Sequence, residues 1–341
     1  MVRSRLRAPP TNMVKHGRGV ATAGGNVSWP ALDTASSRAE GGAMLDTPPC
    51  DVQTLAATTW RARAQSHLER VQRWTVPHRE RRSRRERHPV YDFLFQYYSY
   101  SPGKLEAWHP GVREVVTDSS EAREHFGPPL YQAHDGLIRR DLSVLRAKDL
   151  EQQRSSVRLL VATQSRPPNF GCYGVHEWAM VYGGHDVRHD EVAPFRLPQK
   201  EVDAFVESRP VACSHFDAFR FFAPAAKPMN RMELEWSTRH EVEQPGCIHA
   251  NMDLYRWAYG AMPWIGSDLL WQTFELATEL RVLDMQASPY DLGDFGLEPV
   301  RVETDEGRAE YRMRQQELSG RAGSLRVKLI GALEEVLAAC A

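Results

Sequence analysis

Apolar side chains recur every three to four residues over most of this chain, which is the spacing that one face of an α-helix requires. We therefore predict helices over residues 52–74, 88–101, 139–165, 173–183, 198–207, 215–223, 248–262, 266–285 and 305–338. Strand-like stretches are few and short, at residues 112–117 and 299–304. The pattern predicts a mainly α fold, with a single helical domain over residues 52–341 and a few short strands.

The first 51 residues lack this periodicity. They are rich in Gly, Pro, Ser, Thr and Ala, so they contain too little apolar surface to offset the entropy of ordering. We expect residues 1–51 to be a disordered extension. Codons for Glu40-Gly41-Gly42 can form a purine-rich ribosome-binding site shortly before Met44. We therefore hypothesise that translation starts at Met44.

Charge is unevenly distributed along the chain. Residues 1–87 contain 16 Lys or Arg and 7 Asp or Glu, a net +9, whereas residues 88–341 contain 27 and 37, a net −10. The acidic main body argues against binding to the phosphate backbone of DNA, which requires a basic surface. The basic stretch His78–His88 is interpreted as a solvated helix or linker, with a phosphate-contacting arm as the sharper alternative.

Two further features concern location. No apolar run approaches the ~20 residues of a membrane span, and no secretory signal is apparent. The number of cysteines is odd, which indicates reduced thiols: Cys50, Cys172, Cys213, Cys247 and Cys340. We expect a soluble, cytoplasmic protein with no membrane partner. The sequence does not predict an oligomeric state.

Four segments place a histidine at or near the start of a predicted helix, ahead of aromatic residues. They are HPVYDFLFQYY, GCYGVHEWAMVYGG, ACSHFDAFRFFAP and GCIHANMDLYRWAYG. Their histidines and nearby carboxylates are His88 with Asp92, His176 with Glu177, His215 with Asp217, and His249 with Asp253. Three of the four also have a cysteine just upstream. Buried imidazoles and carboxylates must be paired with another polar group or bind a ligand. If the four segments converge in the fold, these side chains would form a polar pocket.

Several uses of such a pocket fit its chemistry. A non-haem iron or zinc hydrolase or oxygenase would draw its ligands from His88, His176, His215, His249, Asp217 and Asp253. A metal-free pocket could instead stack a flat ligand on aromatic rings and use a carboxylate as general base. In a non-catalytic protein, the same polar rows would only organise the core. The spacing matches no standard metal signature, because HEWAMVY lacks the second histidine of HExxH.

The stretch RVLDMQASPYDLGDFG, residues 281–296, contains Asp284, Asp291 and Asp294. It is interpreted as a helix end followed by turns, with a carboxylate loop that closes the pocket as the alternative. The sequence has no Walker loop, GxGxxG, GxSxG or zinc knuckle, which argues against the common nucleotide-binding and hydrolase folds.

Longer motifs lie between residues 88 and 311: HPVYDFLFQYYSYSP, LEAWHPG, GCYGVHEWAMVY, CSHFDAFRFFAPAAKPMN, EQPGCIHANMDLYRWAY and LDMQASPYDLGDFGLEPVRVETDEGRAEY. Together they resemble an actinobacterial family usually labelled 3-methyladenine DNA glycosylase, and the resemblance covers about residues 55–325. The resemblance implies excision of alkylated bases from DNA without a cofactor, with the flipped base stacked on aromatic side chains.

On that resemblance, DNA is the expected partner. Asp253 or Glu177 would activate water, and His215 and His249 would orient the base. The base would stack on Trp178, Phe216 and Trp257, with Asp92 and Asp217 as further ligand-binding residues.

Overall fold

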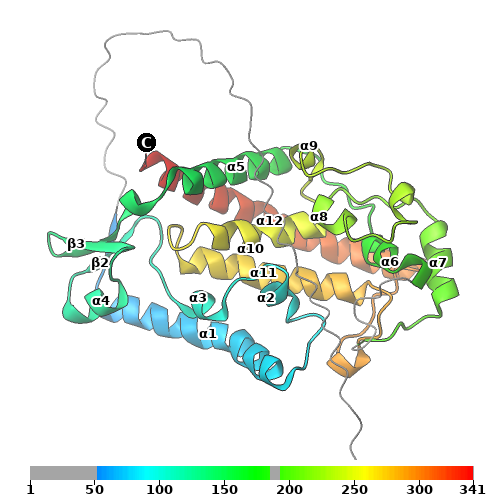
Figure 1. Ribbon diagram of the computed structural model, residues 1–341, viewed down its shortest axis with the longest axis horizontal. Helices are drawn as coiled ribbons and strands as arrows, with labels where there is room; N and C mark the ends of the chain where they lie inside the picture. Colours follow the sequence, from blue (N-terminus) through cyan, green and yellow to red (C-terminus); the bar gives the residue numbers. More distant parts are fainter. Residues whose placement is uncertain (1–51, 185–192, 341) are drawn as a thin grey trace, which may run out of the picture. The chain divides into compact units, whose positions relative to one another are not determined.

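Two helices buried on nearly every face, α10 (Ile248–Gly260) and α11 (Ser267–Gln286), pack against each other at the centre of the fold (Figure 1). They belong to a computed structural model that describes residues 52–184 and 193–340. Only a narrow polar stripe of α11, including Gln272 and Glu275, is exposed, and helices with so little polar surface are stable only when other elements surround them. The surrounding helices are therefore what completes the core.

Twelve α-helices lie within the described residues, so the fold is mainly α as predicted. Besides α10 and α11 they are α1 (Ala57–Arg84), α2 (Phe93–Gln96), α3 (Pro102–Glu106), α4 (Ser120–His125), α5 (Ala147–Gln164), α6 (Val175–Met180), α7 (Gln199–Glu207), α8 (Phe216–Phe219), α9 (Arg239–Val242) and α12 (Asp305–Ala338). Four 3₁₀ turns accompany them: Leu142–Val144, Tyr182–Gly184, Lys227–Met229 and Gly293–Phe295.

The long C-terminal helix α12 packs against α5, α10 and α11. Its buried Arg326 donates to Gln164 Oε1 at 2.7 Å and also to Asn251, which joins three helices through one guanidinium. The helix begins at the Thr304 cap, whose hydroxyl accepts the Gly307 N–H at 3.0 Å. A Cβ at Gly307 would lie 1.9 Å from the Arg301 carbonyl oxygen, so only glycine fits this turn.

A small sheet has the strand order β1-β2-β4-β3. The strands are β1 (Gln53–Leu55), β2 (Glu114–Thr117), β3 (Tyr131–His134) and β4 (Leu137–Arg140). The β1–β2 pair is parallel and the other two pairs are antiparallel. Asp135 and Gly136, at φ 50° and 72°, form the tight turn between β3 and β4. The sheet encloses a separate small core that includes Trp60, Trp108 and Phe126.

Several predicted elements differ from the observed ones. The strand expected at 299–304 is a loop, because among the described residues its backbone bonds to the end of α11 and to itself rather than to a strand. The helix expected at 88–101 is reduced to α2, since the His88 imidazole accepts the N–H groups of Val90 and Tyr91 and forms a turn. The helix expected at 139–165 begins only at Ala147.

The helix expected at 52–74 is present as α1, but it begins at Ala57 and extends to Arg84, and residues 53–55 form β1. The helices expected at 173–183 and 215–223 are shortened to α6 and α8. The other expected elements are present. The strand at 112–117 is β2, and the three C-terminal helices end within about two residues of their predicted limits. The extension 1–51 and the start at Met44 lie outside the described residues. None of the helices that the structure describes combines the length and apolarity needed to cross a membrane.

Candidate metal centre and its cavity

A turn at Gly174 positions the first polar side chains of the site. Gly174 precedes α6 with φ 73°, and a Cβ there would lie 2.9 Å from the Ala287 Cβ. Because only glycine tolerates both the left-handed φ and this close approach, α6 starts directly against the end of α11. Its first turn consequently buries His176 and Glu177 instead of exposing them.

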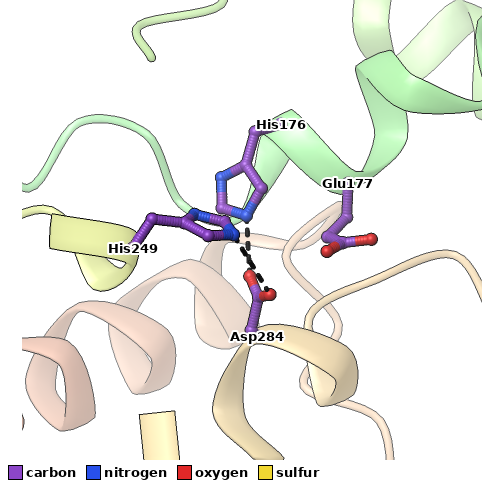
Figure 2. A group of neighbouring side chains, drawn as sticks. All are labelled: His176, Glu177, His249 and Asp284. Atoms are coloured by element: carbon purple, nitrogen blue, oxygen red, sulfur yellow. Dashed lines mark hydrogen bonds and ion pairs between the residues drawn. The ribbon is translucent and has the colours of Figure 1, made fainter. Parts of the chain in front are cut away.

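Four side chains from three helices meet beside this turn (Figure 2). His176 and Glu177 come from α6, His249 from α10 and Asp284 from α11. Each offers one ligand atom, and these atoms all lie within 4.8 Å of one another. His176 Nε2 is 2.6 Å from Asp284 Oδ1, and His249 Nε2 is 3.8 Å from Asp284 Oδ2. We call His176, Glu177, His249 and Asp284 the four-residue cluster.

A buried guanidinium neutralises part of the charge. Arg281 Nη1 donates to Glu177 Oε1 at 2.9 Å and to Asp284 Oδ2 at 2.7 Å. Burial alone would raise the pKa of Asp284, but His176 and Arg281 lower it below its usual value. Arg281 and Asp284 are three residues apart on α11 and so share one face of that helix. The cluster therefore contains two carboxylates opposed by one permanent cation.

The two imidazoles are held differently. His176 has partners at both ring nitrogens, because Cys172 Sγ lies 3.1 Å from its Nδ1 and Asp284 lies at its Nε2. Burial opposes protonation of His176, but the nearby thiol and carboxylate raise its pKa well above the ordinary value. Burial, His176 and His215 lower the pKa of His249, whose ring has no hydrogen bond to any described residue. His249 is thus a neutral imidazole with an available nitrogen.

His215 and Asp253 lie next to the four-residue cluster but do not belong to it. The His215 ring stacks on His249 at 5.5 Å between centroids. Its Nδ1 accepts the Ala218 N–H and caps α8, while its Nε2 lies 3.3 Å from Asp253 Oδ2. Asp253 also accepts the Tyr98 hydroxyl at 2.8 Å. Both ring nitrogens of His215 are therefore already used within the protein.

A cavity with aromatic walls adjoins the cluster. Its polar lining is Glu177, Asp217, His249 and Arg281, and its aromatic lining is Phe93, Tyr97, Phe221 and Tyr290. Its volume is about 60 Å³, whereas about 10–15 Å³ holds one water molecule. The cavity can therefore contain an ion with several waters, or a small flat molecule after modest side-chain movement.

The aromatic residues expected to stack a ligand lie elsewhere. Trp178 is buried, donates its indole N–H to the Ala287 carbonyl at 2.8 Å and packs on Phe205. Phe216 packs on Trp236, and Trp257 lies under two arginines. Trp178, Phe216 and Trp257 are all absent from the cavity lining. The expected ligand-binding residue Asp217 does line it, and pairs with Arg256 at 2.7 Å.

His88 and Asp92 form a group of their own. Asp92 accepts from His78 at 2.9 Å, from Arg81 and from the His88 backbone N–H. The His88 ring stacks on Tyr91 at 4.3 Å. Neither residue belongs to the four-residue cluster or to the cavity lining. The first of the four similar sequence segments is therefore used for a turn and for ion pairing.

Two residues at the centre of the site had no assigned role in the sequence. Asp284 was noted only beside a possible closing loop, yet it enters from within α11, which ends at Gln286. Arg281 was not singled out. The available signal was an Arg and an Asp three positions apart, flanked by Leu280, Val282, Leu283 and Met285, since charges rarely occupy such apolar surroundings unless paired. Asp291 does lie in a turn, where it accepts the Gly293 N–H.

No protein-family model, curated protein or solved structure matches this chain.

Proposed function

We propose that this protein is a metal-dependent enzyme that binds one Fe(II) or Zn(II) ion through His176, His249 and Asp284. The observation that carries this proposal is the meeting of two imidazoles and two carboxylates, all buried, with ligand atoms within 4.8 Å of one another. Two histidines and a carboxylate with open positions form a ligand set used by non-haem iron and by catalytic zinc.

The distances suit one ion after a small adjustment. With bonds of about 2.0–2.2 Å, two ligand atoms on opposite sides of an ion lie roughly 4–4.4 Å apart. The limit of 4.8 Å within the cluster exceeds that by about half an ångström. Cys172 at His176 Nδ1 supports the same assignment, because a ligating histidine usually has its other nitrogen held by a hydrogen-bond partner.

The charge also favours a cation at this position. Glu177 and Asp284 supply two negative charges against the single positive charge of Arg281. An additional cation is therefore favourable, and in the metal-free protein it is the proton shared between His176 and Asp284. A metal ion would replace that proton.

The adjoining cavity suggests the substrate class. Four aromatic rings line it, so a small planar molecule would be held by its faces while its polar group meets His249 and Glu177. A bound ion would polarise a substrate oxygen or lower the pKa of a water ligand to about 7. Glu177 lies on the cavity and is oriented by Arg281, which suits a carboxylate that accepts a proton from substrate or water.

Metal analysis tests the proposal. Protein purified without chelators, and protein reconstituted anaerobically with Fe(II) or with Zn(II), should contain about one ion per chain. Asp284→Asn and His249→Ala should each lose it, whereas Asp294→Asn and His240→Ala, at exposed positions, should retain it. Absence of iron, zinc and manganese after reconstitution would remove the proposal.

Base excision from alkylated DNA is the second candidate, supported by the aromatic cavity with Glu177 at its wall. It requires no metal. In this function the protein should release free base from alkylated DNA in the presence of a chelator, and Glu177→Gln should stop the release. No release alongside an active control glycosylase would exclude it.

A further inference from the structure

A broad groove at the C-terminal end of α1 lies away from the cavity and has no role in the function proposed above. It has a volume of about 930 Å³. Three arginines line it, Arg82, Arg85 and Arg87, together with the polar side chains of Gln96, Ser99 and Ser101. We call this the basic groove.

The three arginines differ from their neighbours in sequence. Arg79 pairs with Glu106, Arg81 with Asp92 and Arg84 with Glu86. Arg82, Arg85 and Arg87 are exposed and have no side-chain hydrogen bond or ion pair to any residue that the structure describes. Glu86 also lines the groove, but Arg84 lies 2.9 Å from its carboxylate. The groove therefore presents three positive charges without internal compensation.

The backbone around the groove is unusual at two positions. Arg85 and Ser99 have φ angles of 59° and 54°. A left-handed conformation costs a residue with a side chain on the order of 1 kcal/mol. Arg85 caps α1, which accounts for its conformation. Ser99 follows α2 and turns the chain along the opposite wall, where its hydroxyl donates to the Gln96 carbonyl at 3.2 Å.

We propose that the basic groove binds a small oligophosphate, meaning two or three linked phosphate groups, either free or as the tail of a nucleotide. Guanidinium groups match phosphate oxygens with two parallel hydrogen bonds. The Ser101 hydroxyl and the Gln96 amide on the facing wall supply further donors. A ligand confined to the groove is favoured because the neighbouring arginines of α1, Arg79, Arg81 and Arg84, are already paired with carboxylates and offer less to a longer polyanion.

This site is separate from the metal centre. The short segment around α2 contributes residues to the lining of both the cavity and the basic groove. Phe93 and Tyr97 face the cavity, whereas Asp92, Gln96 and Ser99 face the basic groove. Occupancy of the groove can therefore be measured without a metal ion, and the outcome does not depend on the function proposed above.

Calorimetric titration of the full chain with inorganic triphosphate in a chelator-containing, low-salt buffer tests the proposal. We expect micromolar binding that weakens as salt increases. The triple variant Arg82→Gln, Arg85→Gln, Arg87→Gln should weaken binding at least tenfold. The matched control Arg73→Gln, Arg139→Gln, Arg312→Gln removes the same charge from exposed positions outside the groove and should bind within about twofold of the unmodified protein.

Parallel titrations with pyrophosphate and a nucleoside triphosphate distinguish a free oligophosphate from a nucleotide tail, and either result supports the proposal. Lack of triphosphate binding by the unmodified protein would overturn it, as would equal weakening in the two triple variants. A twelve-residue single-stranded oligonucleotide that binds more tightly than triphosphate, through the same arginines, would also overturn it in favour of a nucleic-acid surface.

Discussion

His176 Nε2 lies 2.6 Å from Asp284 Oδ1, although the two residues are 108 positions apart in the chain. Both side chains are buried, and Arg281 bonds to the second oxygen of the same carboxylate. The contact joins the first turn of α6 to the last turns of α11. It also places a proton where the proposed metal ion would bind. A metal centre and a purely structural polar core would therefore respond differently to substitution of these side chains.

Arg281→Gln should destabilise the metal-free protein. Loss of one partner from a buried ion pair costs about 3–5 kcal/mol, here because Glu177 and Asp284 lose their guanidinium. If the site binds metal, saturating Zn(II) should restore more stability to the variant than it adds to the unmodified protein. Urea unfolding with and without Zn(II) measures this, with the exposed Arg312→Gln as control. Destabilisation with no effect of Zn(II) on either protein would favour a purely structural role.

Replacement of His249 by alanine should mainly affect metal binding, whereas replacement of His215 should mainly affect stability. The His249 ring has no hydrogen bond to any described residue, so His249→Ala should mainly abolish metal binding, with a stability loss of about 1 kcal/mol or less. His215→Ala removes the cap of α8 and a partner of buried Asp253, so it should cost about 2–4 kcal/mol. Metal content and urea unfolding of both variants test the contrast. A greater stability loss for His249→Ala would contradict it.

Tyr98→Phe should lower the free energy of unfolding by about 1–3 kcal/mol, because it removes a hydrogen bond to the buried Asp253 carboxylate. Tyr255→Phe on α10 is the matched control, since its buried hydroxyl has no partner in the described part of the chain. That change should be neutral or stabilising. Equal effects of the two substitutions in urea unfolding would show that the Tyr98–Asp253 bond contributes nothing.

His109 should make the protein sensitive to acid. Burial, followed by Arg140, lowers the pKa of His109 from 6.5 to about 4. In the unfolded chain this imidazole becomes protonated below about pH 6.5, whereas in the folded protein it stays neutral down to about pH 4. The free energy of unfolding therefore falls as the pH decreases across this window. His109→Gln should remove about 1–3 kcal/mol of that loss.

Urea unfolding at pH 7 and at pH 4.5 measures the effect of His109→Gln. His134 is exposed, so His134→Gln should leave the pH dependence as in the unmodified protein. If His109→Gln does so too, His109 is not the source of the acid sensitivity.

Helical periodicity in the sequence was enough to predict α10, α11 and α12, because each is long and its pattern depends only on residues within a few turns. The hairpin of β3 and β4 was missed, although its Asp135-Gly136 turn is a hairpin signal, because its strands are four residues each and show little alternation. The prediction of a strand at 299–304 was wrong because a strand must pair with a neighbouring strand, and none of the described strands pairs with this segment.

The candidate site shows the same division. The sequence by itself determined that histidines and carboxylates begin several helices next to apolar faces, since this depends on spacing of one to four residues. Only the tertiary structure decided that His176 and His249 approach within 4.6 Å between ring centroids while His88 joins a separate group. The tertiary structure also decided that Asp284 and Arg281, and not other charged residues, lie beside these histidines. Which buried polar groups become partners depends on helix packing across more than 100 residues, and local spacing contains no information about that packing.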